Sequence, residues 1–88
     1  MTTKHRDADE SARENLARSQ VALLVMGARK RMGISSQEKL AEEAGVSRAT
    51  IARIELGLVT PSILTSRGLA RALGLRLGDL RPDIAGAA

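Results

Sequence analysis

The segment Ser47–Leu56 has a spacing of residue types that fits a defined chemistry. At about 100° per residue, Ile51 and Ile54 fall on one side of a helix, which predicts the buried side. The opposite side presents long cations beside small side chains, a set suited to contact with another molecule. The residues on or at the edge of this outward side are Arg48, Ala49, Ala52, Arg53 and Leu56.

Long cations that flank small residues suit the major groove of DNA, because small residues let a helix sit deep. An arginine in the first turn, Arg48, can reach base edges, where bidentate contact with guanine is the commonest specific pairing. Ala49 can touch a thymine methyl group, and Arg53 can reach a base or a phosphate. Ser47 and Gln37, at the starts of this helix and of the preceding one, are placed to bind phosphates through side chain and backbone N–H. An amphipathic helix that only faces solvent would show the same distribution of residues around its axis. The helical wheel alone therefore leaves open whether this face binds DNA or is simply solvated.

A second helical pattern and a tight turn must position this helix. Ser35 or Ser36 begins the second pattern: Ser35 with Glu38 forms a capping box, whereas Ser36 gives the apolar residues the better phase. Gly45 tolerates a positive φ at the turn, and Ser47 caps the helix that follows. The apolar positions of the second pattern are Leu40, Ala41 and Ala44.

A long helical pattern, from about Ser11 to Met32, precedes this pair. Gly27 lies inside it and costs about 1 kcal/mol relative to alanine, which indicates either close packing or a bend. Cations occupy its last turn, where the helix dipole favours them, and Gly33 ends it.

A fourth helix follows the loop after Gly57. It begins at Ser62, or at Thr60 with Pro61 in the first helical position, and runs to about Leu73. A last short helical turn spans 75–80, and no strand pattern occurs, so the prediction is an all-α fold. We expect a flexible tail over residues 1–10, a helical domain over 11–81 and a frayed tail over 82–88. In the first tail, Lys4, His5 and Arg6 are either solvated or a basic arm.

The composition excludes several classes of protein. The 88 residues suggest one domain, and the absence of Phe, Tyr and Trp argues against a base-stacking platform. The absence of cysteine excludes disulfides and thiolate metal sites. No nucleophile with a nearby base and no phosphate-binding glycine loop occurs, so we expect no enzyme, no metal and no cofactor. The formal charge of +4 suits nucleic acid, and the lack of a long apolar run predicts a cytoplasmic protein that spans no membrane.

Read as a whole, the chain resembles the Cro/CI-type helix-turn-helix family, the XRE-like or lambda-repressor-like transcription regulators. The resemblance rests on SQEKLAEEAGVSRATIARIELG, followed by TPSILTSRGLARALGLRLGDL, and runs from about Val25 to Leu80. It implies a compact five-helix bundle whose third helix enters the major groove of double-stranded DNA.

The resemblance also implies roles for individual residues. Base-contacting positions fall on Arg48, Ala49 and Arg53, and phosphate-contacting positions on Gln37, Ser47 and Thr50. Arg29, at the end of the first helix, is placed against Glu55 as an intramolecular ion pair that fixes the angle of the third helix.

Three features depart from the family pattern. The link 33–36 is one residue longer than usual, the loop Leu58–Val59–Thr60 is apolar where relatives carry polar residues, and the first helix extends upstream. The apolar loop puts phosphate contacts from it in doubt. It either meets a second subunit or folds back into the core.

Such a module implies a homodimer on a palindromic operator, with recognition helices roughly 34 Å apart. The function expected is therefore a small dimeric repressor. The alternative is an antitoxin or antiactivator that binds a partner protein, with or without operator binding. Candidate dimer-interface residues are Leu58, Val59, Leu77 and Leu80, with Leu75 and Ile84 beside them, and some of these leucines must be core.

Overall fold

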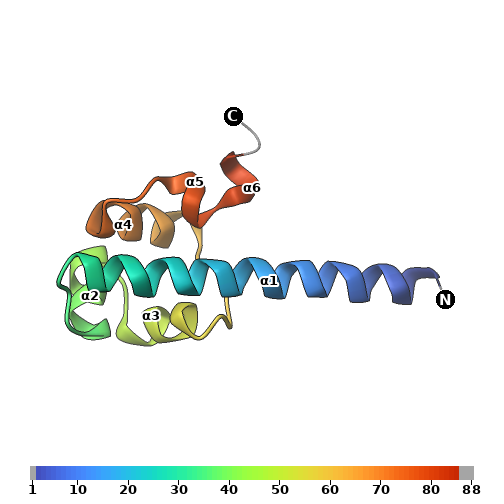
Figure 1. Cartoon of the computed structure of the whole chain (residues 1–88), viewed down its shortest axis with the longest axis horizontal. Coiled ribbons are helices and arrows are strands. Elements are labelled where there is room, and N and C mark those ends of the chain that lie inside the picture. Colours follow the sequence, from blue (N-terminus) through green and yellow to red (C-terminus); the bar gives the residue numbers. More distant parts are fainter. Residues whose placement is uncertain (1, 86–88) are drawn as a thin grey trace.

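A computed structural model describes residues 2–85 and folds them into six helices. Figure 1 shows one long helix, α1, with α3 on one side of its C-terminal half, α4 to α6 on the other and α2 at its C-terminal end. The all-α prediction is confirmed, and the helix count is six rather than five. The helices are α1 (Thr2–Arg31), α2 (Gln37–Ala44), α3 (Arg48–Glu55), α4 (Ile63–Leu73), α5 (Leu77–Leu80) and α6 (Pro82–Ala85).

The first helix begins at Thr2, well before the predicted start at Ser11. All but the first of residues 1–10, where we expected a tail, lie in α1. This segment is polar, but it contains no Gly or Pro that would end a helix. Glu14 and Arg18 add an i,i+4 ion pair at 3.9 Å. The N-terminal half of α1 consequently extends beyond the bundle as a continuous rod (Figure 1).

The sixth helix occupies the first part of the segment predicted to be a frayed tail. Pro82 takes the first helical position, where its missing N–H costs nothing. Arg81 pairs with Asp83 in the first turn, with Nη2 2.7 Å from Oδ2. Helical structure therefore continues to Ala85, and the remainder of the predicted tail, 86–88, lies outside the described residues.

Serine side chains begin the three helices that follow α1. Ser36, Ser47 and Ser62 each accept a hydrogen bond from the backbone N–H three residues on, at 3.0–3.1 Å. The alternatives left by the sequence are thereby decided: Ser36 rather than Ser35 caps α2, and Ser62 rather than Thr60 caps α4.

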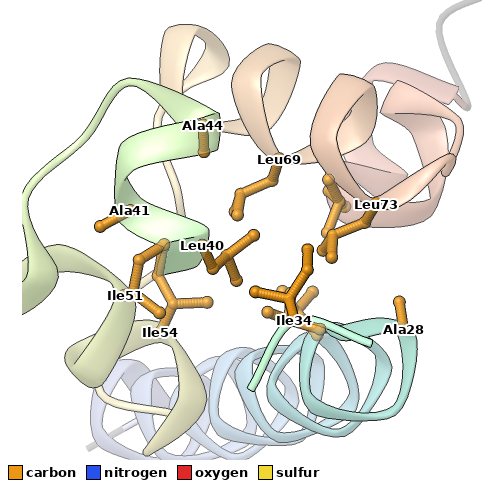
Figure 2. Packing of buried hydrophobic residues seen from close by; sticks show 12 residues of the cluster. Ala28, Ile34, Leu40, Ala41, Ala44, Ile51, Ile54, Leu69 and Leu73 are labelled. Carbon is orange, nitrogen blue, oxygen red and sulfur yellow. The ribbon is translucent and has the colours of Figure 1, made fainter. Parts of the chain in front are cut away.

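The core is aliphatic and lies between α1, α2, α3 and α4 (Figure 2). Leu40 of α2, Ile51 and Ile54 of α3 and Leu69 of α4 are completely buried. Leu80 of α5 is buried in the same cluster, so its prediction as a dimer-interface residue is wrong. The spacing of the C-terminal leucines shows that they share a face but cannot tell whether that face turns inward.

A close approach between helices occurs at Gly68 and not at Gly27. A Cβ added to Gly68 would collide with the carbonyl oxygen of Ala44 and lie 3.1 Å from the carbonyl carbon. A Cβ added to Gly27 would meet, within 4 Å, only the side chain of Arg31. Gly68 therefore lets α4 touch the end of α2 and helps to hold α2 in place. No contact among the described residues explains why position 27 is a glycine.

Candidate nucleic-acid interface

The helices α2 and α3 are joined by a short turn at Gly45. Its φ of 73° lies in the left-handed region, as the sequence predicted. The N–H of Gly45 bonds to the carbonyl of Glu42 at 3.3 Å, and that of Val46 to the carbonyl of Ala41 at 3.0 Å. Val46 is half-buried against the core. These bonds and this contact fix the orientation of α3 relative to α2.

The third helix divides into two faces, as the wheel predicted. Ile51 and Ile54 have no exposed surface, and Glu55 is buried beside them. The predicted base-contacting residues Arg48, Ala49 and Arg53 are all exposed. Thr50 and Ala52 are half-buried at the border between the faces.

A buried hydrogen-bonded cluster holds the inward end of α3. The Arg29 guanidinium donates to both oxygens of Glu55, from Nε to Oε2 at 2.9 Å and from Nη2 to Oε1 at 3.2 Å. Its Nη1 donates to the carbonyl of Ile34 at 3.3 Å. The ion pair implied by the family resemblance is therefore present, and only 3% of the Glu55 side chain is exposed. A bidentate pair of this kind fixes orientation as well as distance.

Gln37 also belongs to this cluster, a contact that sequence patterns did not predict. Its Nε2 donates to Glu55 Oε1 at 3.0 Å, so the Glu55 carboxylate is held from α1 and α2 together. The backbone N–H of Gln37, in the first turn of α2, has no partner within the helix, so it is the group left for the predicted phosphate contact. The cluster joins residues of three helices. Because these residues are far apart in the chain, the periodicity of the sequence does not reveal that they meet.

The start of α3 carries the other two predicted phosphate contacts. Ser47 Oγ accepts from the N–H of Thr50 at 3.1 Å and lies 2.8 Å from Thr50 Oγ1. The cap leaves the N–H groups of Arg48 and Ala49 at the exposed helix start, where the dipole favours an anion.

The outward face of α3 is electropositive. Neither Arg48 nor Arg53 forms an ion pair with a described residue. Glu55 is the one acidic residue of α3, and it is buried against Arg29. The face therefore presents two cations and no carboxylate, an arrangement that attracts a polyanion and repels none.

A family model for helix-turn-helix proteins, HTH_3, matches residues 25–80. This span contains α2 to α5 and residues 25–31 at the C-terminal end of α1. The chain belongs to the HTH_3 helix-turn-helix family of transcriptional regulators, the Cro/CI type. It is thus a DNA-binding regulator and not an enzyme.

Named relatives agree with this membership. An uncharacterised HTH-type transcriptional regulator from Methanothermobacter thermautotrophicus is 45% identical over 51 residues, which are 58% of this chain and 72% of the relative. The HTH-type transcriptional regulator YgzD from Bacillus subtilis is 42% identical over 45 residues, 51% of this chain and 68% of the relative.

A solved structure also shares the fold. The crystal structure of an HTH_3 family transcriptional regulator from Vibrio cholerae superposes with a TM-score of 0.67 at 28% identity and covers 80% of this chain. The regulator described here corresponds to 39% of that chain, so the larger protein contains much that has no counterpart here.

The remaining candidate interface residues of this HTH_3 regulator differ in exposure. Leu58 is 63% exposed, whereas Val59 is half-buried against the core and Leu77 is half-buried in α5. Leu58 is therefore the most accessible residue among them. Within residues 2–85, no group of His, Cys, Asp or Glu side chains is placed to hold a metal ion, and no helix is apolar enough over a membrane-spanning length.

Proposed function

We propose that this regulator is a homodimeric repressor that binds a palindromic operator with α3 in the major groove. The observation that supports this most strongly is the exposed, acid-free face of α3. In this proposal, Arg48 and Arg53 read base edges and Ala49 contacts a thymine methyl group. The N-termini of α2 and α3, at Gln37 and at Ser47 with Thr50, hold phosphates.

A dimer follows from the size of the module. One helix-turn-helix unit covers about half an operator, and a two-fold pair places recognition helices roughly 34 Å apart on the same side of the duplex. A bound dimer can block transcription by occupying the operator. The protein would act in the cytoplasm. The exposed side chain of Leu58 supports a dimer contact beside the DNA-binding unit.

The decisive experiment compares Arg48→Ala with the parent protein on an operator selected from random DNA. The substitution should cost about 1–3 kcal/mol on the operator and much less on random sequence, because a base contact is lost. Arg71→Ala is the matched control, since Arg71 is exposed on α4 outside the helix-turn-helix. Equal losses on both DNAs would make Arg48 a phosphate contact, and binding indifferent to salt would exclude the proposal.

A second candidate function is an antitoxin or antiactivator that binds a partner protein. The observation that favours it is the exposed apolar pair Leu56 and Leu58, 71% and 63% exposed, just after α3. Recovery of a stoichiometric protein partner, together with failure to select any operator from random DNA, would decide for this function.

A further inference from the structure

We propose that two copies of this regulator pair antiparallel along α1, through a surface on the side of this helix that faces away from the bundle. We call this surface the α1 stripe and define it by Asp9, Ala12, Leu16, Leu23, Gly27 and Lys30. The inference rests on the proposed homodimer and supplies its interface.

Two leucines in this surface are exposed in the part of the chain that the structure describes. Leu16 is 60% exposed and Leu23 is 68% exposed. They are one heptad apart, so a helix of about 100° per residue brings them within roughly 20° of the same direction. Val21 and Val25, on the opposite side of α1, are buried in the core. A long helix with a second apolar face of this kind is typical of helix pairing.

The α1 stripe is complementary to itself when reversed. With a two-fold axis between Ser19 and Gln20, Leu16 lies opposite Leu23 of the second copy. The same axis places Ala12 opposite Gly27 of the second copy. It also places Asp9 opposite Lys30 of the second copy, so each end of the interface joins opposite charges.

Two other arrangements of the same helices are less favourable. A parallel pair would set Asp9 against Asp9 and Lys30 against Lys30, which repel. An antiparallel pair shifted by one heptad would set Leu16 against Leu16, but it would bury Asp9 against Leu23. Exposed charges contribute little binding energy, yet they discriminate between registers in this way.

The proposed pairing explains why position 27 is a glycine, which contacts within one copy do not. A glycine within a helix is unfavourable relative to alanine, and a Cβ at Gly27 would meet nothing within 4 Å except the Arg31 side chain. Opposite Ala12, a residue without a Cβ allows the two helices to approach closely.

The same axis leaves both recognition helices on one side of the pair. The helix α3 meets α1 at Arg29, through Glu55, and at Ser19, whose Cα would lie 3.7 Å from a Cβ on Gly57. On the α1 wheel these two contacts average roughly 80° from Leu23. Since the two-fold axis runs at a right angle to the contact direction, both copies of α3 lie on the same side. Leu58 follows Gly57 beside the axis and extends the interface.

The experiment measures self-association by sedimentation over a range of concentrations. The double substitution Leu16→Glu with Leu23→Glu should weaken dimerisation about tenfold or more, because it buries carboxylates at the contact. Leu64→Glu is the matched control, since Leu64 is 78% exposed but lies on α4. Asp9→Lys should weaken the dimer, and adding Lys30→Asp should restore it. A dimer whose dissociation constant is unchanged by the substitutions in the α1 stripe would overturn the proposal.

Cross-linking provides a second measurement that does not depend on a destabilising change. The chain has no cysteine, so single cysteines report pairing without interference. Gln20→Cys should form a disulfide-linked dimer on oxidation, because its two copies lie beside the axis. Ala12→Cys should not, because its two copies lie roughly 22 Å apart along the helices. The reverse result would overturn the antiparallel register.

The two proposals fail in different ways. If the stripe variant is monomeric but still prefers a half-operator in an Arg48-dependent manner, base reading by α3 stands and the interface is assigned. If the parent protein is monomeric both free and on DNA, α1 pairing fails while base reading remains open to the Arg48→Ala test. If Arg48→Ala has no effect but α1 pairs as described, DNA recognition by α3 fails and the interface stands.

Discussion

The ion pairs Arg29–Glu55 and Arg81–Asp83 differ in a way that distance alone does not reveal. Arg81 and Asp83 approach more closely, at 2.7 Å against 2.9 Å for Arg29 and Glu55. Yet the Asp83 side chain is 61% exposed and the Glu55 side chain 3%. Water competes for an exposed pair, whereas a buried carboxylate depends on its protein partners. Burial and the number of bonds, rather than the shortest distance, identify the pair that matters.

The two pairs also differ in what they join. Arg81 and Asp83 are two residues apart and hold the start of α6, which Arg81 also joins to the loop before α4 by donating from Nη1 to the carbonyl of Pro61 at 3.3 Å. Arg29 and Glu55 are 26 residues apart and connect α1 with the inward end of α3. The long-range pair can therefore set the direction of the recognition helix, while the local pair acts on α6 and the loop before α4.

The largest effect is expected from Arg29→Met. This change leaves the buried Glu55 carboxylate without its cation, which should lower the free energy of unfolding by about 3–5 kcal/mol. Urea denaturation measures the loss. Operator affinity, measured where the variant is still folded, should also fall because α3 is no longer held at one angle.

The control for this prediction is Arg31→Met, in the same turn of α1. Arg31 is exposed, so its replacement should change stability by no more than about 0.5 kcal/mol. Similar losses in the free energy of unfolding for both variants would mean that the buried ion pair contributes no more to stability than an exposed arginine does.

An intermediate effect is expected from Gln37→Ala, which removes the third side-chain bond to Glu55. The loss should be about 1.5 kcal/mol, the low end for a hydrogen bond to a charged group, because Gln37 is half-buried and Arg29 remains in place. Urea denaturation again measures it. If Gln37 meets phosphate through its backbone N–H, the salt dependence of DNA binding should stay unchanged; a shallower dependence would assign the side chain to phosphate instead.

The smallest effect is expected from Asp83→Asn. The hydrogen bond from Arg81, aided by its charge, holds the pKa of Asp83 below its ordinary value of 3.8. Because the pKa is lower in the folded state, the pair stabilises the protein above about pH 4 and loses this contribution as the pH falls further. The variant should be slightly less stable than the parent near neutral pH, and this difference should vanish in acid, where the Asp83 carboxylate of the parent is protonated. A large difference at neutral pH in thermal unfolding would contradict the ranking of the two pairs.

Local features of the fold were predictable from the sequence because each depends on few neighbouring residues. Serine caps and glycine turns act within one helical turn, so the positions of α2 and α3 followed from Ser47 and Gly45. The faces of α3 followed from the helical period of Ile51 and Ile54. The roles of Arg48, Ala49 and Arg53 in DNA contact stay predictions, although their exposure fits them.

Errors arose where the outcome depended on distant packing or on a missing signal. Polar residues before Ser11 were interpreted as a tail, yet nothing in them ends a helix. Leu80 was assigned to an interface because spacing reveals a shared face and not its direction. The role of Gly68 was not predictable, since it depends on the carbonyl of Ala44 on another helix.

By itself, the sequence determined where short helices begin and end and which residues α3 turns outward, because hydrogen-bond geometry and helical period are local. Only the tertiary structure decided that Gln37 joins Arg29 on the Glu55 carboxylate, that Leu80 lies in the core, and that Leu16 and Leu23 remain uncovered. These outcomes depend on which helices meet in space, and one residue's neighbours along the chain do not encode that.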